Sequence, residues 1–137
     1  MDVTKIPFVE KVGVIKATNG GLELPFSESV HNHLQTIHAS AQFALAETAS
    51  GETLTTLFPE LVGKVIPVLR DSQIKFRKPA SSTISANSSI TEESVVKFKE
   101  QLSKKGRALI SVNVEIKDQD GIVTSKSIFN WFVQSIV

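Results

Sequence analysis

The stretch that decides the fold runs from Asn32 to Gly51 and reads NHLQTIHASAQFALAETASG. Its second half, Ala39 to Ala49, holds five alanines and two larger apolar residues. Alanine is the best helix former, and glycine commonly follows the last turn of a helix. The sequence therefore predicts an apolar helix from residue 39 to residue 50 that ends at Gly51. Glu47 lies within it, and a carboxylate in so apolar a helix requires a specific explanation.

Strand-like segments flank this helix on both sides. Before it, Ile6 to Lys16 is rich in Val, Ile and Phe, and Asn19 to Gly21 supplies a turn that returns the chain through Leu22 to Phe26 as a short hairpin. After it, residues 62–76 are mostly β-branched and aliphatic. Pro67 inside this segment removes one backbone donor, which indicates an edge strand or a bulge. Residues 83–90 form a weaker strand.

The last third of the chain predicts a second helix followed by a hairpin. The helix begins at Thr91, a capping hydroxyl followed by two glutamates, and ends with two lysines and Gly106. Apolar and polar residues then alternate from Ala108 to Lys117, the period of a strand with one buried face. Asp118 to Gly121 is the turn, and Ile122 to Ile136 is the returning strand. The pattern predicts an antiparallel sheet wrapped around the first helix, with a second, short helix.

Composition limits the class of protein. A chain of 137 residues with 41% hydrophobic residues suits a single domain spanning residues 1–137. With 15 basic and 14 acidic side chains, no global field attracts nucleic acid or an anionic membrane, and no segment reaches the length of a membrane span. The absence of cysteine excludes thiolate chemistry and fits a reducing compartment. We expect a cytoplasmic protein with no nucleic-acid or membrane partner.

The polar residues of the decisive stretch resemble those of a known family. The spacing Asn32-x5-His38, a helix opening directly after the histidine, and an acid nine residues later at Glu47 resemble the active-site segment of hotdog-fold acyl-CoA thioesterases, above all the phenylacetate-pathway and 4-hydroxybenzoyl-CoA branches. Phe76 to Ala80 and Asp118 to Gly121 also resemble family segments. The resemblance implies an α+β hotdog fold, hydrolysis of an acyl-CoA substrate, and neither a cofactor nor a metal.

The spacing of the site residues also constrains the assembly. The nine steps from His38, where the helix opens, to Glu47 span about 13 Å and turn the helix by about half a revolution net. The amide of Ala39 and the carboxylate of Glu47 therefore cannot reach one carbonyl within a single chain. Two copies whose helices pack antiparallel about a two-fold axis would bring them together twice. We expect a homodimer, or a tetramer made of two dimers.

The resemblance assigns a role to each residue. The Ala39 amide, at the positive end of the helix dipole, would bind the thioester oxygen as it gains negative charge. Glu47 would attack the carbonyl or deprotonate a water molecule, and the sequence does not choose between these. Asn32 would position that water or the carbonyl. His38 would fix the turn that aims the amide by donating a hydrogen bond to a backbone carbonyl.

Four further residues are candidates for binding substrate. Gln35 and Ser40 flank the site in the sequence, and Arg77 and Lys78 would meet the coenzyme A phosphates. For the two cations, the simpler interpretation is a pair of solvated charges at a strand end. Ser40 and Glu47 are seven residues apart and share a helix face, so composition alone would place both in a stripe of solvated polar residues on that face. Only the family spacing favours an active-site role for Glu47 over this solvated stripe.

Other functions compete with hydrolysis. The family usually has glycines where this chain has Ala39 and Ser40, and a narrower approach to the helix N-terminus favours a non-catalytic acyl-CoA or lipid-binding module. His33, fourteen residues before Glu47, is spaced as in acyl-thioester dehydratases, but the other elements of those enzymes are absent. The three histidines lack carboxylates at ligand spacing, so chance clustering is favoured over a metal site.

Overall fold

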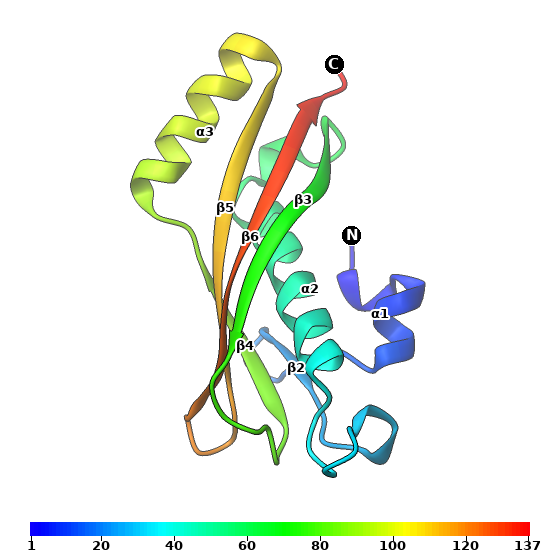
Figure 1. Ribbon diagram of the computed structural model, residues 1–137. Helices are drawn as coiled ribbons and strands as arrows, with labels where there is room; N and C mark the ends of the chain where they lie inside the picture. The colour runs from blue at the N-terminus through cyan, green and yellow to red at the C-terminus, as the bar shows by residue number, and fades with distance from the viewer.

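The protein is built on one antiparallel sheet, seen in a computed structural model that describes residues 1–137 (Figure 1). The order of its six strands is β1-β2-β4-β5-β6-β3, and every neighbouring pair is antiparallel. The strands are β1 (Ile15–Lys16), β2 (Leu22–Leu24), β3 (Val65–Phe76), β4 (Ile84–Ser89), β5 (Arg107–Lys117) and β6 (Val123–Ser135). The strands predicted after the first helix are therefore all present.

Three helices accompany the sheet: α1 (Pro7–Val12), α2 (Ala39–Leu57) and α3 (Glu92–Lys105), with short 3-10 turns at Val3–Lys5, Glu28–Val30 and Pro59–Leu61. The long helix α2 packs on the face of the sheet and contacts β2, β3, β4, β5 and β6. The predicted architecture, an antiparallel sheet around one apolar helix, is confirmed. None of the helices combines the length with the apolar character that a membrane crossing requires.

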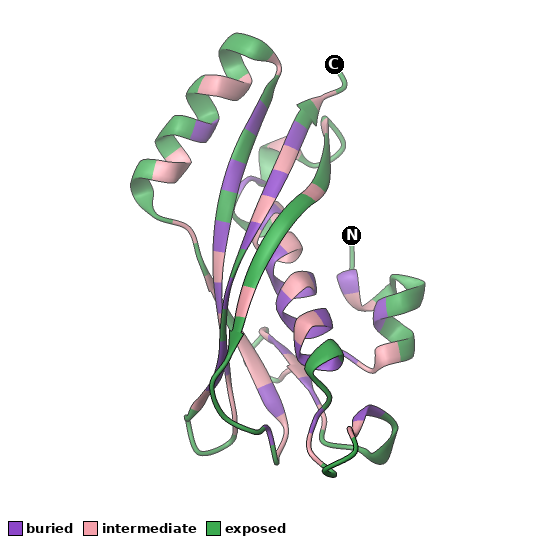
Figure 2. Cartoon of the chain, viewed as in Figure 1, coloured by how far each residue is buried: buried purple, intermediate pink, exposed green.

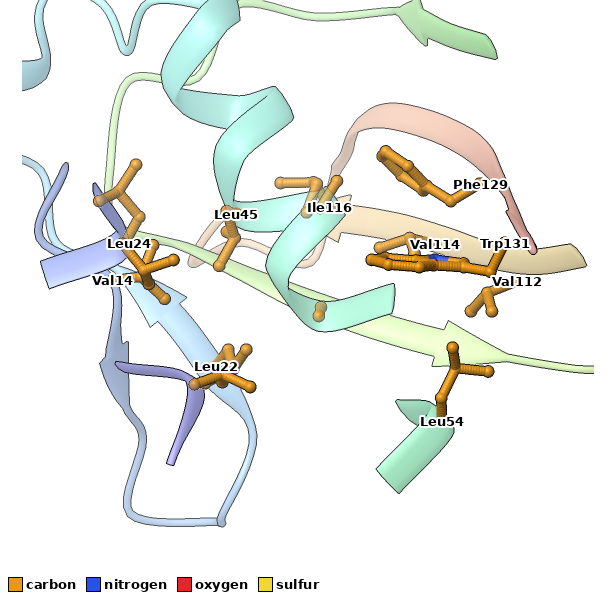
Figure 3. Close-up of a cluster of buried hydrophobic side chains, with 14 of the residues drawn as sticks. Val14, Leu22, Leu24, Leu45, Leu54, Val112, Val114, Ile116, Phe129 and Trp131 are labelled. Atoms are coloured by element: carbon orange, nitrogen blue, oxygen red, sulfur yellow. The ribbon is translucent and has the colours of Figure 1, made fainter. Parts of the chain in front are cut away.

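The core lies between α2 and the inner face of the sheet. Along β5, the even-numbered residues from Ala108 to Ile116 are buried, whereas the odd-numbered ones are exposed or half-buried. Figure 3 shows Leu45 and Leu54, both from α2, among buried side chains of the central strands, including Phe129 of β6. The alternation predicted from the sequence is thus the alternation of the buried face.

The helix predicted to begin at Thr91, which is α3 in the structure, begins and ends as predicted. The Thr91 hydroxyl accepts the Ser94 N–H at 3.1 Å, and Gly106 closes the helix at φ 71°. Its one fully buried side chain is Phe98, whose ring lies 4.9 Å from the ring of Phe58, just after the end of α2. α3 therefore covers the sheet beyond the end of the long helix.

β3 is an edge strand, as Pro67 predicted. It pairs only with β6, and the register shifts between Leu69 and Asp71. None of its twelve residues is buried, although the strand includes the apolar side chains Ile66 and Val68, which are 51% and 53% exposed (Figure 2). A long, exposed, apolar edge of this kind is a surface that another strand can pair with.

The predicted strand from Ile6 to Lys16 is wrong over most of its length. Residues 7–12 form α1, and only Ile15–Lys16 is extended. Proline at the first helical position and Gly13 at φ 102° after the last are standard helix boundaries, and they outweigh the β-branched composition. The hairpin through residues 19–21 is present, since β1 pairs with β2.

The predicted end of the long helix at Gly51 is also wrong, because α2 continues to Leu57. A Cβ atom at Gly51 would lie 3.3 Å from Cζ2 of Trp131, a contact tighter than ordinary van der Waals packing. The indole Nε1 donates to Ser50 Oγ at 3.0 Å. The glycine therefore serves the close approach of the helix to a tryptophan of β6, and it is not a cap.

Candidate active site

The start of α2 offers one backbone donor that the chain itself does not use. The Ser40 N–H donates to Nδ1 of His38 at 3.0 Å, and the amides of Ala41 and Gln42 donate to the His38 carbonyl. The Ala39 N–H makes no hydrogen bond, and Ala39 is exposed. Unused amides at a helix N-terminus attract negative charge. The structure thus leaves available the amide that the sequence singled out.

His38 holds this turn in a different way from the one predicted. Its ring nitrogen Nδ1 accepts from the Ser40 N–H, whereas the prediction had the imidazole donating to a carbonyl. Since an accepting nitrogen carries no proton, this bond requires the proton of the neutral ring to lie on Nε2. His38 is therefore the N-cap of α2, a position that usually holds Ser, Thr, Asp or Asn.

Asn32 organises the loop that leads to the helix. Its Oδ1 accepts from the backbone amides of Leu34 at 2.8 Å and Thr36 at 3.1 Å, and its Nδ2 donates to Thr36 Oγ1 at 2.8 Å. Gln35, at the tip of this loop, is exposed and adopts φ 58°. These bonds show that Asn32 holds its own loop together. One amide hydrogen of Asn32 stays free, so its positioning of water or substrate remains a prediction.

Glu47 lies two turns further along α2 and is half-buried. No hydrogen bond or ion pair in the chain reaches its carboxylate, and burial raises its pKa above the ordinary value of 4.5. The neighbouring Glu52, by contrast, pairs with Lys16. Since buried carboxylates are normally paired, an unpaired one is a candidate for chemistry. The solvated stripe does not describe Glu47, although Ser40 itself is exposed.

Glu47 borders a cavity of about 470 Å³ that the sequence analysis did not identify. Other walls come from residues far apart in the sequence, from Val3 near the N-terminus to Trp131 in β6. The sequence holds one local sign of this cavity. Gly51 and Thr55 follow Glu47 at intervals of four residues, so these small residues lie on the same side of the helix as Glu47. The rest of the wall depends on long-range packing.

The two cations lie on the segment beside the Asn32 loop. The backbone amides of Arg77 and Lys78 both donate to the Thr124 carbonyl, and both side chains are exposed. A few residues on, the Ala80 carbonyl accepts from Ile37, which immediately precedes the N-cap of α2. The fold thus brings this segment to the start of the helix.

Within one chain, the site residues fall into two groups. The first group surrounds the start of α2 and consists of Asn32, Gln35, His38, Ala39 and Ser40, together with the segment that carries Arg77 and Lys78. Glu47 lies eight residues past the free amide, about 12 Å along the helix axis. His33 is exposed in the loop, and no three His or acidic residues gather where they could hold a metal ion.

The arrangement of these elements defines the class of the protein, which is a hotdog fold: an antiparallel sheet wrapped around a long helix whose N-terminus is open. The chain belongs to the family described as a domain of unknown function, DUF4442, which matches residues 5–133. A search of curated protein sequences found no match.

Several solved structures share this fold. PA5026 from Pseudomonas aeruginosa, described as a probable thioesterase, is 24% identical with a TM-score of 0.80, over 97% of this chain and 91% of its own. Thioesterase HI1161 from Haemophilus influenzae is 15% identical with a TM-score of 0.77, over 98% and 87%. BH2602 from Bacillus halodurans, solved with CoA, is 21% identical with a TM-score of 0.69, over 92% and 74%. At these identities the similarity establishes the fold.

Proposed function

We propose that this protein hydrolyses acyl-CoA thioesters, with Glu47 as the residue on which the reaction depends. The observation that carries the proposal is the unpaired, half-buried carboxylate on the wall of an apolar cavity. Burial makes such a group more basic than a solvated glutamate, which suits proton abstraction near neutral pH. The thioesterases among proteins of the same fold support this reaction class.

Two copies of the chain are needed in this proposal. The free Ala39 amide and Glu47 are about 12 Å apart along one helix, so a single chain does not offer both to one carbonyl. A two-fold axis that sets two α2 helices antiparallel would place the amide of one copy near Glu47 of its partner. The exposed edge strand β3 supports such an assembly, because its outer backbone groups are free to pair with a second sheet.

At the shared site, the amide of Ala39 would donate to the thioester oxygen as charge develops there. In the water route, Glu47 takes a proton from water, the hydroxide adds to the carbonyl carbon, and the carbon–sulfur bond breaks. The proton then passes from Glu47 to the departing CoA thiolate. In the direct route, the carboxylate itself attacks and water resolves the anhydride. Both routes need the ionised form of Glu47, so the rate rises with pH through its raised pKa.

The bound coenzyme A would extend toward the segment after β3. Arg77 and Lys78 are exposed cations beside the loop that leads to α2, and there they would bind the phosphates of coenzyme A. The free amide hydrogen of Asn32 would hold the water or the carbonyl, and Gln35 and Ser40 would line the approach. The CoA bound by the similar protein BH2602 supports a ligand of this type.

A thiol-release assay with short, medium, long and aromatic acyl-CoAs tests the proposal directly. We expect turnover that depends on Glu47 and is lost in Glu47→Gln. Saturable binding of every acyl-CoA without release of thiol from any would reject hydrolysis and identify the non-catalytic binding module instead.

A further inference from the structure

The cavity next to Glu47 is long and follows α2. Its helix side is formed by residues that recur on one face: Glu47, Thr48, Gly51, Leu54, Thr55 and Phe58. The eleven steps from Glu47 to Phe58, the residue after the end of α2, span about 16 Å along the helix axis. At the far end, the ring of Phe98 of α3 lies against that of Phe58, and both residues line the cavity. The space is therefore an elongated channel that starts beside the carboxylate.

The walls of this channel carry almost no charge. Glu47 has the only ionisable side chain among the lining residues, which are mostly apolar. No Lys, Arg or His side chain lines the cavity, and the one amine among its lining residues is the N-terminal amine of Met1, a residue that is 91% exposed. A carboxylate or a phosphate buried in the cavity would therefore lack a partner. The buried part of any occupant is therefore uncharged and apolar, and its polar group lies at the Glu47 end.

The volume indicates the size of that occupant. A water molecule takes about 30 Å³ in the liquid, and a methylene group is of similar size, so 470 Å³ holds on the order of fifteen such groups. A single aromatic ring would fill only part of a channel about 16 Å long. A linear hydrocarbon chain matches both the length and the volume.

The N-terminal segment forms the wall opposite α2. Val3 and Val9 are buried and anchor it, whereas Ile6 and Phe8, which also line the cavity, are 39% and 67% exposed. Figure 1 shows this segment beside α2. An apolar ligand in the channel would cover side chains that otherwise contact water.

We propose that the substrate is the thioester of an unbranched, medium- to long-chain fatty acid, whose chain lies along α2 from Glu47 toward Phe58 and Phe98. This inference rests on the proposed hydrolysis, since it places the thioester carbonyl beside Glu47. It names the acyl group that the sequence left open.

The test measures binding without turnover. The thioethers S-decyl-CoA and S-ethyl-CoA have no carbonyl and cannot be hydrolysed. Trp131 is the only tryptophan in the chain and lines the cavity, so its fluorescence reports occupancy. At about 0.8 kcal/mol, or roughly a fourfold gain in affinity, for each buried methylene group, S-decyl-CoA should bind at least on the order of a hundredfold tighter than S-ethyl-CoA.

Two matched variants locate the chain. Thr55 lines the cavity, whereas its neighbour Thr56 is exposed and does not. Thr55→Phe should block the channel about 12 Å from Glu47 and abolish the preference for the decyl chain, while keeping affinity for S-ethyl-CoA. Thr56→Phe, the same change one residue on, should leave the preference intact.

Equal affinities of the wild type for the two thioethers, or equal behaviour of the two variants, would overturn the inference. A second copy of the chain filling the channel would produce the first of these results. These outcomes separate the fatty acyl chain from the proposed reaction. Tight, length-dependent binding without hydrolysis of decanoyl-CoA would reject only the hydrolytic activity. Hydrolysis of short or aromatic acyl-CoAs without length dependence would reject only the fatty acyl chain.

Discussion

The two halves of α2 differ in how far their polar groups are hydrogen-bonded. At its start, the His38 cap satisfies the backbone amides of Ser40, Ala41 and Gln42 and leaves that of Ala39 free. In its middle, Glu47 has no partner and lies against an apolar cavity. The first half is stabilised by hydrogen bonds and has one free backbone amide, whereas the second retains an unsatisfied acceptor. The helix separates the two by about 12 Å, which is why the proposed reaction combines them from two copies of the chain.

The largest effect is expected from Glu47→Gln. This change keeps the size of the side chain and removes the basic oxygen, so kcat should fall by roughly two to four orders of magnitude, as for losing a general base. Steady-state thiol release measures it, and Glu52→Gln on the next turn is the matched control. Near-native turnover in the Gln variant would make Glu47 a structural residue.

The second test removes one hydrogen atom from the other half of the helix. Ala39→Pro deletes the free N–H, and proline suits the first helical position because the preceding His38 has φ −60° and ψ 141°. We expect kcat to fall about a hundred- to a thousandfold, as for losing an oxyanion donor, with the melting temperature unchanged. An active proline variant would exclude this amide from the reaction.

Mixing the two inactive variants decides whether the halves come from different chains. In a heterodimer of Glu47→Gln and Ala39→Pro, one of the two sites has both groups native. Co-refolded equal amounts should recover about a quarter of the wild-type activity, since about half the dimers are mixed and each has one intact site. A site formed within one chain would show no recovery.

A smaller effect is expected beyond the start of the helix. Arg77→Gln and Lys78→Gln should each raise KM for acyl-CoA by roughly two- to fivefold, as for an exposed ion pair, with kcat unchanged. The dependence of KM on salt should flatten, because fewer charges remain to be screened. Kinetics at low and high salt measure both quantities, and an unaltered KM in both variants would remove these cations from the site.

The cap at the start of the helix should affect stability more than chemistry. His38→Ala leaves the Ser40 N–H without its acceptor and should cost about 1 kcal/mol of unfolding free energy, whereas His38→Asn restores a side chain suited to the N-cap. Urea denaturation compares the two variants. Equal destabilisation by Ala and Asn would mean that the hydrogen bond to Ser40 contributes nothing.

The smallest expected effect is a change of stability with pH. Burial raises the pKa of Glu47 in the folded protein above the unfolded value of 4.5. As the pH rises above 4.5, the unfolded chain loses this proton while the folded protein still holds it. The stability contributed by Glu47 is therefore lost as the pH rises through the folded pKa. Glu47→Gln removes this loss. The variant should therefore gain stability relative to the wild type at pH 7 compared with pH 4, as measured by urea unfolding. A constant difference would mean that Glu47 is not desolvated.

The sequence predicted those parts of the fold that depend on local signals. Alternation along β5, the cap at Thr91 and the edge position of Pro67 all follow from nearby residues. Gly51 was misread because its reason is Trp131, eighty residues away, which the chain does not bring close until it folds. Between residues 6 and 16, the helix signals of Pro7 and Gly13 compete with a β-branched composition that favours a strand, and the helix signals prevail.

For the candidate site, the sequence identified the free amide and the carboxylate but not their surroundings. Histidine is an uncommon N-cap, so its accepting nitrogen was not anticipated at His38. The cavity wall joins the N-terminal segment, α2, residues 61–63, β3, α3 and β6. No spacing rule within one segment predicts a volume that so many segments enclose.

The position of β3 in the sheet affects how the chain folds as it is synthesised. Its only neighbour is β6, and Phe76 pairs with Ser125 while Val65 pairs with Ser135. At 5 to 20 residues per second, β3 leaves the ribosome roughly 3 to 10 s before its partner strand. During that time β3 has no strand to pair with, so we expect newly made chains to be prone to aggregate through this edge.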